Sequence, residues 1–240
     1  MNVGSNVDLG SGVSGYLALP TGAGPHPGVL LYMEAFGLND YVRSECDRLA
    51  RLGFAALAPD FYRGDVFEYA NFAPVAKKIQ SIGDDGFVAD IRAAIAFLDA
   101  HADVRHDGYG VVGFCMGGRL AFLTAADFGE RIVAAASFYG GGIAPETPRF
   151  GRPPLAPRAP EIRAKLLMIY GADDAGIPPT EIAHVTGALA AAKIDATVHV
   201  YPNAGHGFAS SDRESYVPAV TEAAWAETAA FLERAFATRS

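Results

Sequence analysis

Short apolar runs alternate with amphipathic stretches along most of the chain. The runs are continuously apolar, which is typical of strands that are buried on both faces of a parallel sheet. One or two further strands are expected before Pro20, which precedes a turn rich in glycine and proline. We expect the buried strands at 28–33, 54–58, 109–112, 132–138, 166–170 and 196–201.

Helical periodicity follows most of these runs. In the stretch 40–53 the side chains of Val42, Cys46 and Leu49 fall on one helical face, so Cys46 is expected to be a buried apolar residue. The segment 61–86 is less regular, and 143–160 contains six prolines, so it is expected to cross the surface without regular structure and to border the pocket. We expect helices at 40–53, 74–82, 90–102, 119–128, 179–193 and 216–237.

Alternating strands and helices predict an α/β fold with a mostly parallel central sheet that helices cover on both faces. In such folds, ligands bind at the carboxyl ends of the strands. The sequence has no internal repeat and no linker between two apolar cores, so we expect residues 1–240 to form a single domain.

The amino-acid composition limits the possible binding partners of the protein and its possible cellular compartment. The formal net charge of -8 argues against nucleic acids and anionic membranes as partners. The sequence shows neither a signal peptide nor an apolar stretch of about 18 residues, so we expect no membrane span. Its two cysteines are far apart and make no disulfide framework, which suits a reducing cytoplasm. We therefore expect a cytoplasmic monomer that acts on a small molecule.

The most informative stretch is 113–118 (GFCMGG), where one cysteine lies between glycines directly after an apolar run. An apolar strand, a tight turn with a nucleophile and a helix form the G-x-S-x-G nucleophile elbow, here with Cys115 in the serine position. Side chains at Gly113 or Gly117 would crowd a sharply bent backbone, so glycine suits both positions. The pattern predicts a nucleophilic cysteine at the end of a strand.

An acid and a histidine follow in the order nucleophile, acid, histidine that is typical of this arrangement. Asp173 and Asp174 both lie in the loop after the predicted strand 166–170, and His206 follows the strand predicted at 196–201. No histidine pair has metal-ligand spacing with a supporting carboxylate and cysteine, and no G-x-G-x-x-G motif is present. We therefore expect neither a metal nor a nucleotide cofactor.

These motifs resemble the dienelactone hydrolase family over nearly the whole chain. The most specific of them are 34–39 with Arg43, 59–62, 113–118, 171–178 and 204–208. In that family an apolar residue and a proline follow the acid by three and four residues, which here selects Asp174 over Asp173 because Ile177 and Pro178 follow.

The resemblance implies an α/β-hydrolase fold and hydrolysis of small lactones or esters, of the carboxymethylenebutenolidase type. The reaction would use a Cys115–His206–Asp174 triad and an acyl-enzyme. It also implies that Glu34 hydrogen-bonds the resting thiol and helps to deliver the thiolate, which is the reactive form of cysteine. The backbone N–H groups of Met116 and Ala35 are expected to form the oxyanion hole.

The substrate contacts depart from the family pattern. The family holds the substrate carboxylate with an arginine four residues after the catalytic histidine, where this chain has Ser210; the nearest arginine is Arg213. The family's second contact, an arginine and a tyrosine before the helix predicted at 90–102, has no clean match here. Our candidates for substrate contacts are Phe36, Tyr69, Tyr139, Phe208 and Arg213.

Three other interpretations fit parts of the sequence. A carboxylesterase of the same fold could act on a different small ester, and some members of such folds bind ligands without catalysis. The complete set of Cys115, Asp174 and His206 argues against a silent member. A redox-active cysteine protein would need a second cysteine to resolve it, and Cys46 is expected to be buried on a helix.

Overall fold

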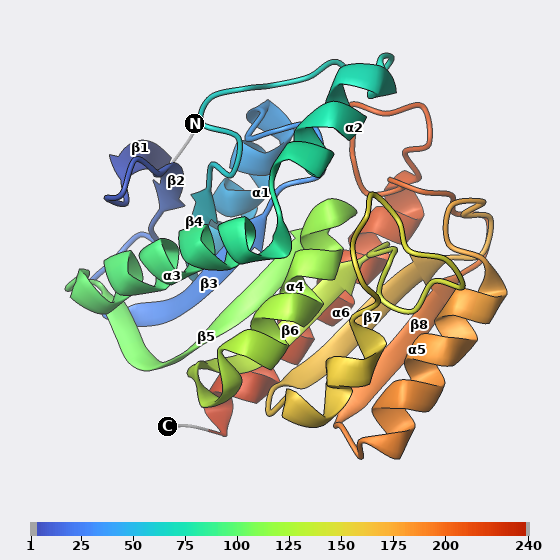
Figure 1. Ribbon diagram of the computed structural model, residues 1–240. Coiled ribbons are helices and arrows are strands. Elements are labelled where there is room, and N and C mark those ends of the chain that lie inside the picture. Colours follow the sequence, from blue (N-terminus) through green and yellow to red (C-terminus); the bar gives the residue numbers. More distant parts are fainter. Residues whose placement is uncertain (1–3, 239–240) are drawn as a thin grey trace.

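One eight-stranded sheet runs through the centre of the molecule (Figure 1). The computed structural model describes residues 4–238. The strands lie in the order β1-β2-β4-β3-β5-β6-β7-β8, and all neighbours from β4 to β8 are parallel, whereas β1 and β2 pair antiparallel at one edge. The strands are β1 Gly4–Asp8, β2 Ser14–Ala18, β3 His26–Tyr32, β4 Ala55–Pro59, β5 Val104–Phe114, β6 Ile132–Phe138, β7 Lys165–Gly171 and β8 Ala196–Tyr201.

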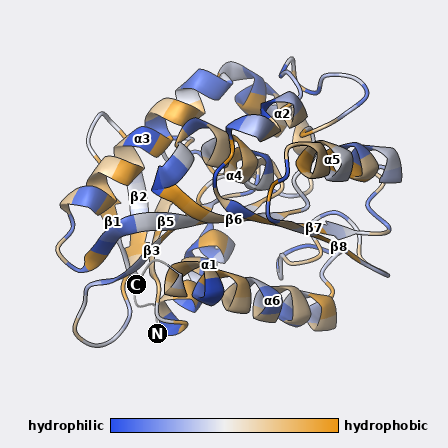
Figure 2. Ribbon diagram, turned by 90° about the horizontal axis from the view of Figure 1, so that it is seen from below, coloured by the Kyte–Doolittle hydropathy of each residue, from blue (hydrophilic) through white to orange (hydrophobic). Residues whose placement is uncertain are grey.

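Helices cover both faces of this sheet, as the alternating pattern predicted. Figure 2 shows the sheet edge-on, with α1 and α6 on one face and α3, α4 and α5 on the other. The helices are α1 Asp40–Arg51, α2 Phe72–Ser81, α3 Asp84–Ala100, α4 Met116–Asp127, α5 Pro179–Ala191 and α6 Pro218–Ala237, with 3-10 turns η1 at Gly129–Arg131 and η2 at Ala156–Glu161.

The core lies on both sides of the central strands. Every residue of β4 and β6 is buried, which accounts for their unbroken apolar sequences. On the face covered by α6, Trp225 packs its ring against Phe114 and Phe138, with ring centroids 6.0 and 5.7 Å apart. The aromatic cluster therefore supports the end of β5, where Cys115 follows.

The sequence placed most elements within a few residues of their observed bounds, but two helices begin earlier than predicted. The helix expected at 90–102 is α3, which begins at Asp84, and the helix expected at 119–128 is α4, which begins at Met116. In both cases glycines occupy the first turn and obscure the helical pattern, because glycine is a poor helix former. Cys46 is fully buried on α1, as expected.

The proline-rich segment 143–160 crosses the surface in bends and ends in η2. Within the segment, the backbone N–H groups of Leu155 and Ala156 both donate to the carbonyl oxygen of Ile143, at 2.8 and 2.9 Å. The segment lies beyond the carboxyl ends of the strands (Figure 1) and forms one wall of the cavity described below. In the described part of the chain, no helix has the length and apolar character that a membrane crossing requires.

Candidate active site

Cys115 joins β5 to α4 in a strained turn. Its backbone lies at φ 53° and ψ −112°, a region that residues other than glycine rarely adopt. The surrounding glycine allows the turn: a Cβ atom on Gly117 would lie 2.5 Å from the Tyr32 carbonyl oxygen and 2.6 Å from that of Met33. The Cys115 N–H donates to the carbonyl oxygen of Phe138 at 2.9 Å, which ties the turn to β6. The half-buried thiol thus stands at the end of the central strand.

Three side chains from separate loops meet at this point. The Nε2 atom of His206 lies 3.1 Å from Cys115 Sγ, and its Nδ1 atom lies 2.7 Å from Asp174 Oδ2. Asp174 is buried, and its other carboxylate oxygen accepts the N–H of Gly176 at 2.8 Å, whereas the neighbouring Asp173 is exposed. Of the two candidate acids, Asp174 is therefore the one in contact with the histidine.

The electrostatics of this chain of contacts favour a charged imidazole. Burial lowers the pKa of His206, but the negative charge of a Cys115 thiolate and the hydrogen bond to Asp174 outweigh it and raise the pKa to about 10. An imidazole that lies between two negatively charged hydrogen-bond acceptors binds its proton strongly. The geometry can thus hold an imidazolium next to a thiolate, which is the nucleophilic form of cysteine.

Glu34 follows β3 and lies close to this group, but its contact differs from the one expected. The resemblance implied a hydrogen bond to the resting thiol; within residues 4–238, however, the Oε1 atom instead accepts from Nη1 of Arg213 at 3.2 Å. The Glu34 side chain is 1% exposed, and burial raises its pKa, which the charges of Arg213 and His206 partly offset. Glu34 is therefore a buried carboxylate whose ionisation depends on Arg213.

Two backbone N–H groups are available next to the thiol. Met116 is the first residue of α4, and the first N–H groups of a helix have no partner within it. Among residues 4–238, no acceptor takes the N–H of Ala35, which lies in the loop after β3. Both residues line the cavity together with Cys115.

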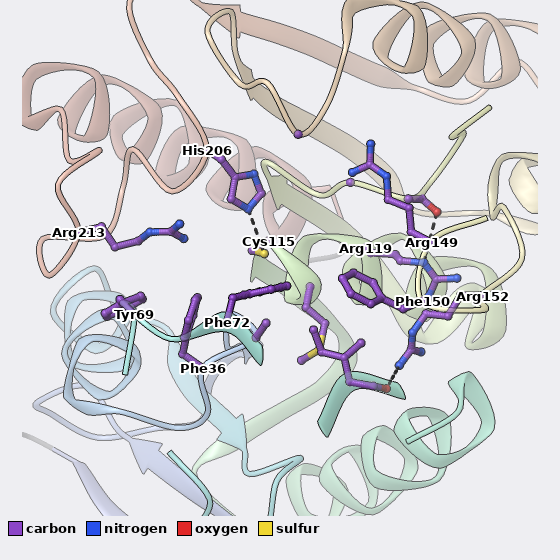
Figure 3. A pocket seen from close by; sticks show the side chains of 16 residues that line it. Phe36, Tyr69, Phe72, Cys115, Arg119, Arg149, Phe150, Arg152, His206 and Arg213 are labelled. Atoms are coloured by element: carbon purple, nitrogen blue, oxygen red, sulfur yellow. Dashed lines mark hydrogen bonds between the residues drawn. The ribbon is translucent and has the colours of Figure 1, made fainter. Parts of the chain in front are cut away.

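A cavity of about 410 Å³ opens in front of Cys115 and His206 (Figure 3). Of the expected substrate contacts, Phe36, Tyr69 and Arg213 line it. The segment 143–160 borders the cavity, as expected, and forms the opposite wall together with α2 and with Arg119 of α4. None of the residues that line this wall was among the expected substrate contacts; they are Phe72, Ile79, Arg119, Arg149, Phe150 and Arg152.

Tyr139 and Phe208, also expected to touch substrate, are fully buried and do not line the cavity. Tyr139 packs edge-on against the ring of His206, with centroids 5.2 Å apart, and Phe208 packs against Tyr139 at the same distance. Tyr139 therefore supports the ring of His206, and Phe208 supports Tyr139 in turn. Ser210 is buried as well, and its hydroxyl lies 3.3 Å from the Tyr69 hydroxyl, so it positions a cavity residue without lining the cavity.

No group of three or more histidine, cysteine, aspartate and glutamate side chains in the described part of the chain is arranged to hold a metal ion. The chemistry that the described residues offer is that of a nucleophile, a proton carrier and an orienting carboxylate, next to two free backbone N–H groups.

The sequence of this chain is similar to those of known proteins. A model of the dienelactone hydrolase family matches residues 13–236. A protein from Methylorubrum extorquens AM1 with the provisional name carboxymethylenebutenolidase is 32% identical over 216 residues, which cover 89% of this chain and 74% of the relative.

Solved structures agree with the family match. A provisional dienelactone hydrolase from Klebsiella pneumoniae is 30% identical with a TM-score of 0.88, covering 95% of this chain and 97% of the other. A dienelactone hydrolase-like promiscuous phosphotriesterase from metagenomic libraries is 26% identical with a TM-score of 0.81, covering 96% of each chain. The fold is thus the α/β-hydrolase fold, and the chain is a hydrolase that belongs to the dienelactone hydrolase family.

Proposed function

We propose that this protein hydrolyses small lactones or esters through a Cys115–His206–Asp174 triad, in the manner of a carboxymethylenebutenolidase. The observation that carries the proposal is the contact chain from Sγ through the imidazole to the buried carboxylate, with distances of 3.1 and 2.7 Å. Such a chain activates a nucleophile and fixes the tautomer and orientation of the histidine.

The first half of the reaction forms an acyl-enzyme. The Cys115 thiolate attacks the carbonyl carbon, and the developing oxyanion accepts hydrogen bonds from the N–H groups of Met116 and Ala35. The bond between the carbonyl carbon and the leaving oxygen then breaks. The His206 imidazolium gives its proton to that oxygen, and Asp174 stabilises the charged imidazole until the transfer.

Hydrolysis of the thioester completes the cycle. The neutral His206 takes a proton from a water molecule, whose oxygen attacks the acyl carbon and breaks the bond to sulfur. The carboxylic acid leaves and the thiolate–imidazolium pair is restored. The strained backbone of Cys115 keeps Sγ at the cavity floor through both halves.

Hydrolysis of p-nitrophenyl acetate and of a dienelactone tests this proposal. We expect Cys115→Ala and His206→Ala each to lower kcat by at least about a thousandfold. Cys46→Ala is the matched control, because Cys46 lies buried on α1 and away from the cavity, so its loss leaves the reaction intact. Mass spectrometry of the intact wild-type protein with substrate should detect an acyl group that the Cys115 variant lacks.

Equal hydrolysis by wild type and Cys115→Ala would exclude this mechanism. The choice between a lactone and an open ester depends on the same assays, since a carboxylesterase of this fold would hydrolyse the acyl ester and leave the dienelactone unchanged. A catalytically silent member would hydrolyse neither compound.

A further inference from the structure

Four arginines line the cavity in front of Cys115, and they differ in how fully their N–H groups are used. They are Arg119, Arg149, Arg152 and Arg213. A guanidinium has five N–H donors, so an arginine whose donors are not all taken by the protein can bind an anionic group of a ligand.

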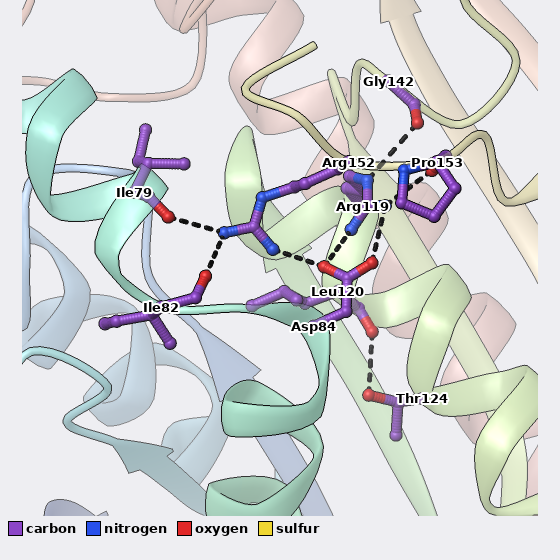
Figure 4. Close-up of polar contacts among 9 residues, drawn as sticks. All are labelled: Ile79, Ile82, Asp84, Arg119, Leu120, Thr124, Gly142, Arg152 and Pro153. Atoms are coloured by element: carbon purple, nitrogen blue, oxygen red, sulfur yellow. Dashed lines mark hydrogen bonds and ion pairs between the residues drawn. The ribbon is translucent and has the colours of Figure 1, made fainter. Parts of the chain in front are cut away.

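Arg119 and Arg152 use most of their N–H groups to hold the wall together (Figure 4). Both donate to the carboxylate of Asp84, and Arg119 does so through two parallel contacts of 2.8 and 2.9 Å. In the described residues, their remaining hydrogen bonds go to backbone carbonyl oxygens, and Arg152 also lies over the ring of Phe87, so both arginines have a structural role. The carbonyl oxygens are those of Gly142 and Pro153 for Arg119, and of Ile79 and Ile82 for Arg152.

Arg213 is engaged on the opposite side of Cys115 (Figure 3). It donates to the buried carboxylate of Glu34, and its guanidinium lies over the rings of Phe36 and Tyr69, 5.6 and 5.5 Å from their centroids. The buried carboxylate neutralises its charge.

Arg149 is different. Its only ion pair in the described part of the chain is with Oε2 of Glu181 at 3.3 Å, and there its guanidinium makes no side-chain hydrogen bond. The other oxygen of Glu181 is taken by the N–H groups of Gly142 and Ile143, at 2.6 and 3.1 Å, which fixes the carboxylate. The Arg149 side chain is 37% exposed and lines the cavity. It is therefore anchored at one edge and has donors free for a ligand.

The net charge of this wall also favours the binding of an anionic group. Among residues 4–238, the three arginines Arg119, Arg149 and Arg152 form ion pairs with two carboxylates, those of Asp84 and Glu181, so the wall has one positive charge in excess. That excess lies in the lining of a cavity, and a cleft lined by charge of one sign attracts an opposite charge more strongly than a flat surface does.

Between the two cationic sides, the cavity is aromatic. The rings of Phe36 and Phe72 lie 6.3 Å apart, and those of Phe72 and Phe150 lie 6.2 Å apart, so the three rings form a continuous row. Phe150 is the neighbour of Arg149 in the chain. A flat apolar group that packs on these rings would carry an anionic substituent toward Arg149.

We infer that Arg149 is the residue of this cavity that binds an anionic group of the ligand, in place of the arginine that the family pattern puts four residues after the catalytic histidine, where this chain has the buried Ser210. The guanidinium edge of Arg149 binds the anionic group, and the aromatic row of Phe36, Phe72 and Phe150 binds a flat apolar part of the ligand. The inference that this ligand is a substrate rests on the proposed function, but binding at Arg149 can be measured without any reaction.

Titration calorimetry with phenylacetate and its neutral counterpart phenylacetamide tests the inference at low ionic strength. We expect the wild-type protein to bind the carboxylate at least about tenfold more tightly than the amide, as one charge-assisted contact provides. Arg149→Gln should remove this preference, and Arg149→Lys, which keeps the charge without the planar fork, should retain part of it. Arg163→Gln is the matched control, because Arg163 is exposed and does not line the cavity.

Three results would overturn the inference: no preference in the wild type, a preference that survives in Arg149→Gln, or one that Arg213→Gln removes and Arg149→Gln leaves intact. Since both ligands bind without hydrolysis, a failure of the Cys115 experiments would contradict the proposed reaction and leave this measurement unaffected.

Discussion

A Cβ atom placed on Gly113 would lie 2.0 Å from the carbonyl oxygen of Gly117. The two residues stand on either side of Cys115, so the first turn of α4 folds back directly against the end of β5. Cys115 itself has the positive φ of this turn, whereas Gly113 is needed for space rather than for an unusual dihedral angle. The distance is far below any real Cβ contact, so a side chain here must displace the elbow.

Gly113→Ala is therefore expected to lower the free energy of unfolding by about 1–3 kcal/mol or more, because the added methyl group overpacks a close backbone contact. Urea denaturation followed by circular dichroism measures the change. The displaced elbow should also reduce ester hydrolysis per folded molecule.

Gly187→Ala provides the matched control in α5. A Cβ atom there meets nothing within 4 Å, so alanine should stabilise the protein by about 0.5–1 kcal/mol through its higher helix propensity. If the two alanine variants were equally stable, the crowding at Gly113 would not be what restricts that position.

The strands were predictable because each central strand is buried on both faces and so appears as an unbroken apolar run. β6 and β8 have the bounds that the sequence predicted. β5 is longer than predicted, since its first residues, Val104 to Gly108, are largely polar or exposed. The loops at the carboxyl ends followed from the strands, which is why Asp174 and His206 could be placed beside Cys115.

For the opposite wall of the cavity, the sequence predicted that the segment 143–160 borders the pocket, but not which residues line it. Its position depends on Arg152, which donates to the backbone carbonyl oxygens of Ile79 and Ile82, and backbone acceptors leave no trace in a sequence. The pairing of Glu34 with Arg213 joins residues 179 positions apart, and no periodicity links them. Phe72 and Phe150 meet only because these contacts bring α2 and the segment 143–160 together.

Asp174→Asn should lower the pKa of His206 below its value of about 10, because the hydrogen bond and charge of this carboxylate help to hold the imidazole proton. The imidazolium would then persist only to a lower pH. An NMR titration of the His206 ring measures the shift, and kcat should fall by roughly 10⁴-fold, as for other triads that lose the orienting acid. Asp173→Asn is the control, since Asp173 is exposed; an unchanged pKa in Asp174→Asn would contradict the assignment.

Arg213→Gln should destabilise the protein, and more so at high pH. Burial raises the pKa of Glu34 and the Arg213 charge lowers it, so removing that charge raises the pKa further. A raised carboxyl pKa stabilises the folded state at low pH, and this contribution is lost as the pH rises through the folded-state pKa. The loss relative to wild type should therefore be small near pH 5 and reach about 3 kcal/mol near pH 8, where the buried carboxylate is unpaired.

Urea denaturation at both pH values measures this difference. The double variant Glu34→Gln/Arg213→Gln has no buried charge at this pair, so its stability relative to wild type should vary less with pH than that of Arg213→Gln. A destabilisation of Arg213→Gln that stayed constant with pH would assign the effect to lost ring packing over Phe36 and Tyr69.

Asp84→Asn is expected to destabilise both the wall of the cavity and the fold. Its carboxylate accepts from both Arg119 and Arg152, and although burial raises the pKa of Asp84, these arginines outweigh it and hold the pKa below its usual range. Removing the charge leaves two buried guanidiniums without their counter-ion, which should cost about 3 kcal/mol in urea denaturation. Asp65→Asn, which breaks an exposed pair with Lys78, should cost less than about 1 kcal/mol.

Because Arg152 also holds the segment that carries Phe150, the Asp84 variant should bind phenylacetate more weakly than the Asp65 variant; equal binding would show that the network does not shape the cavity.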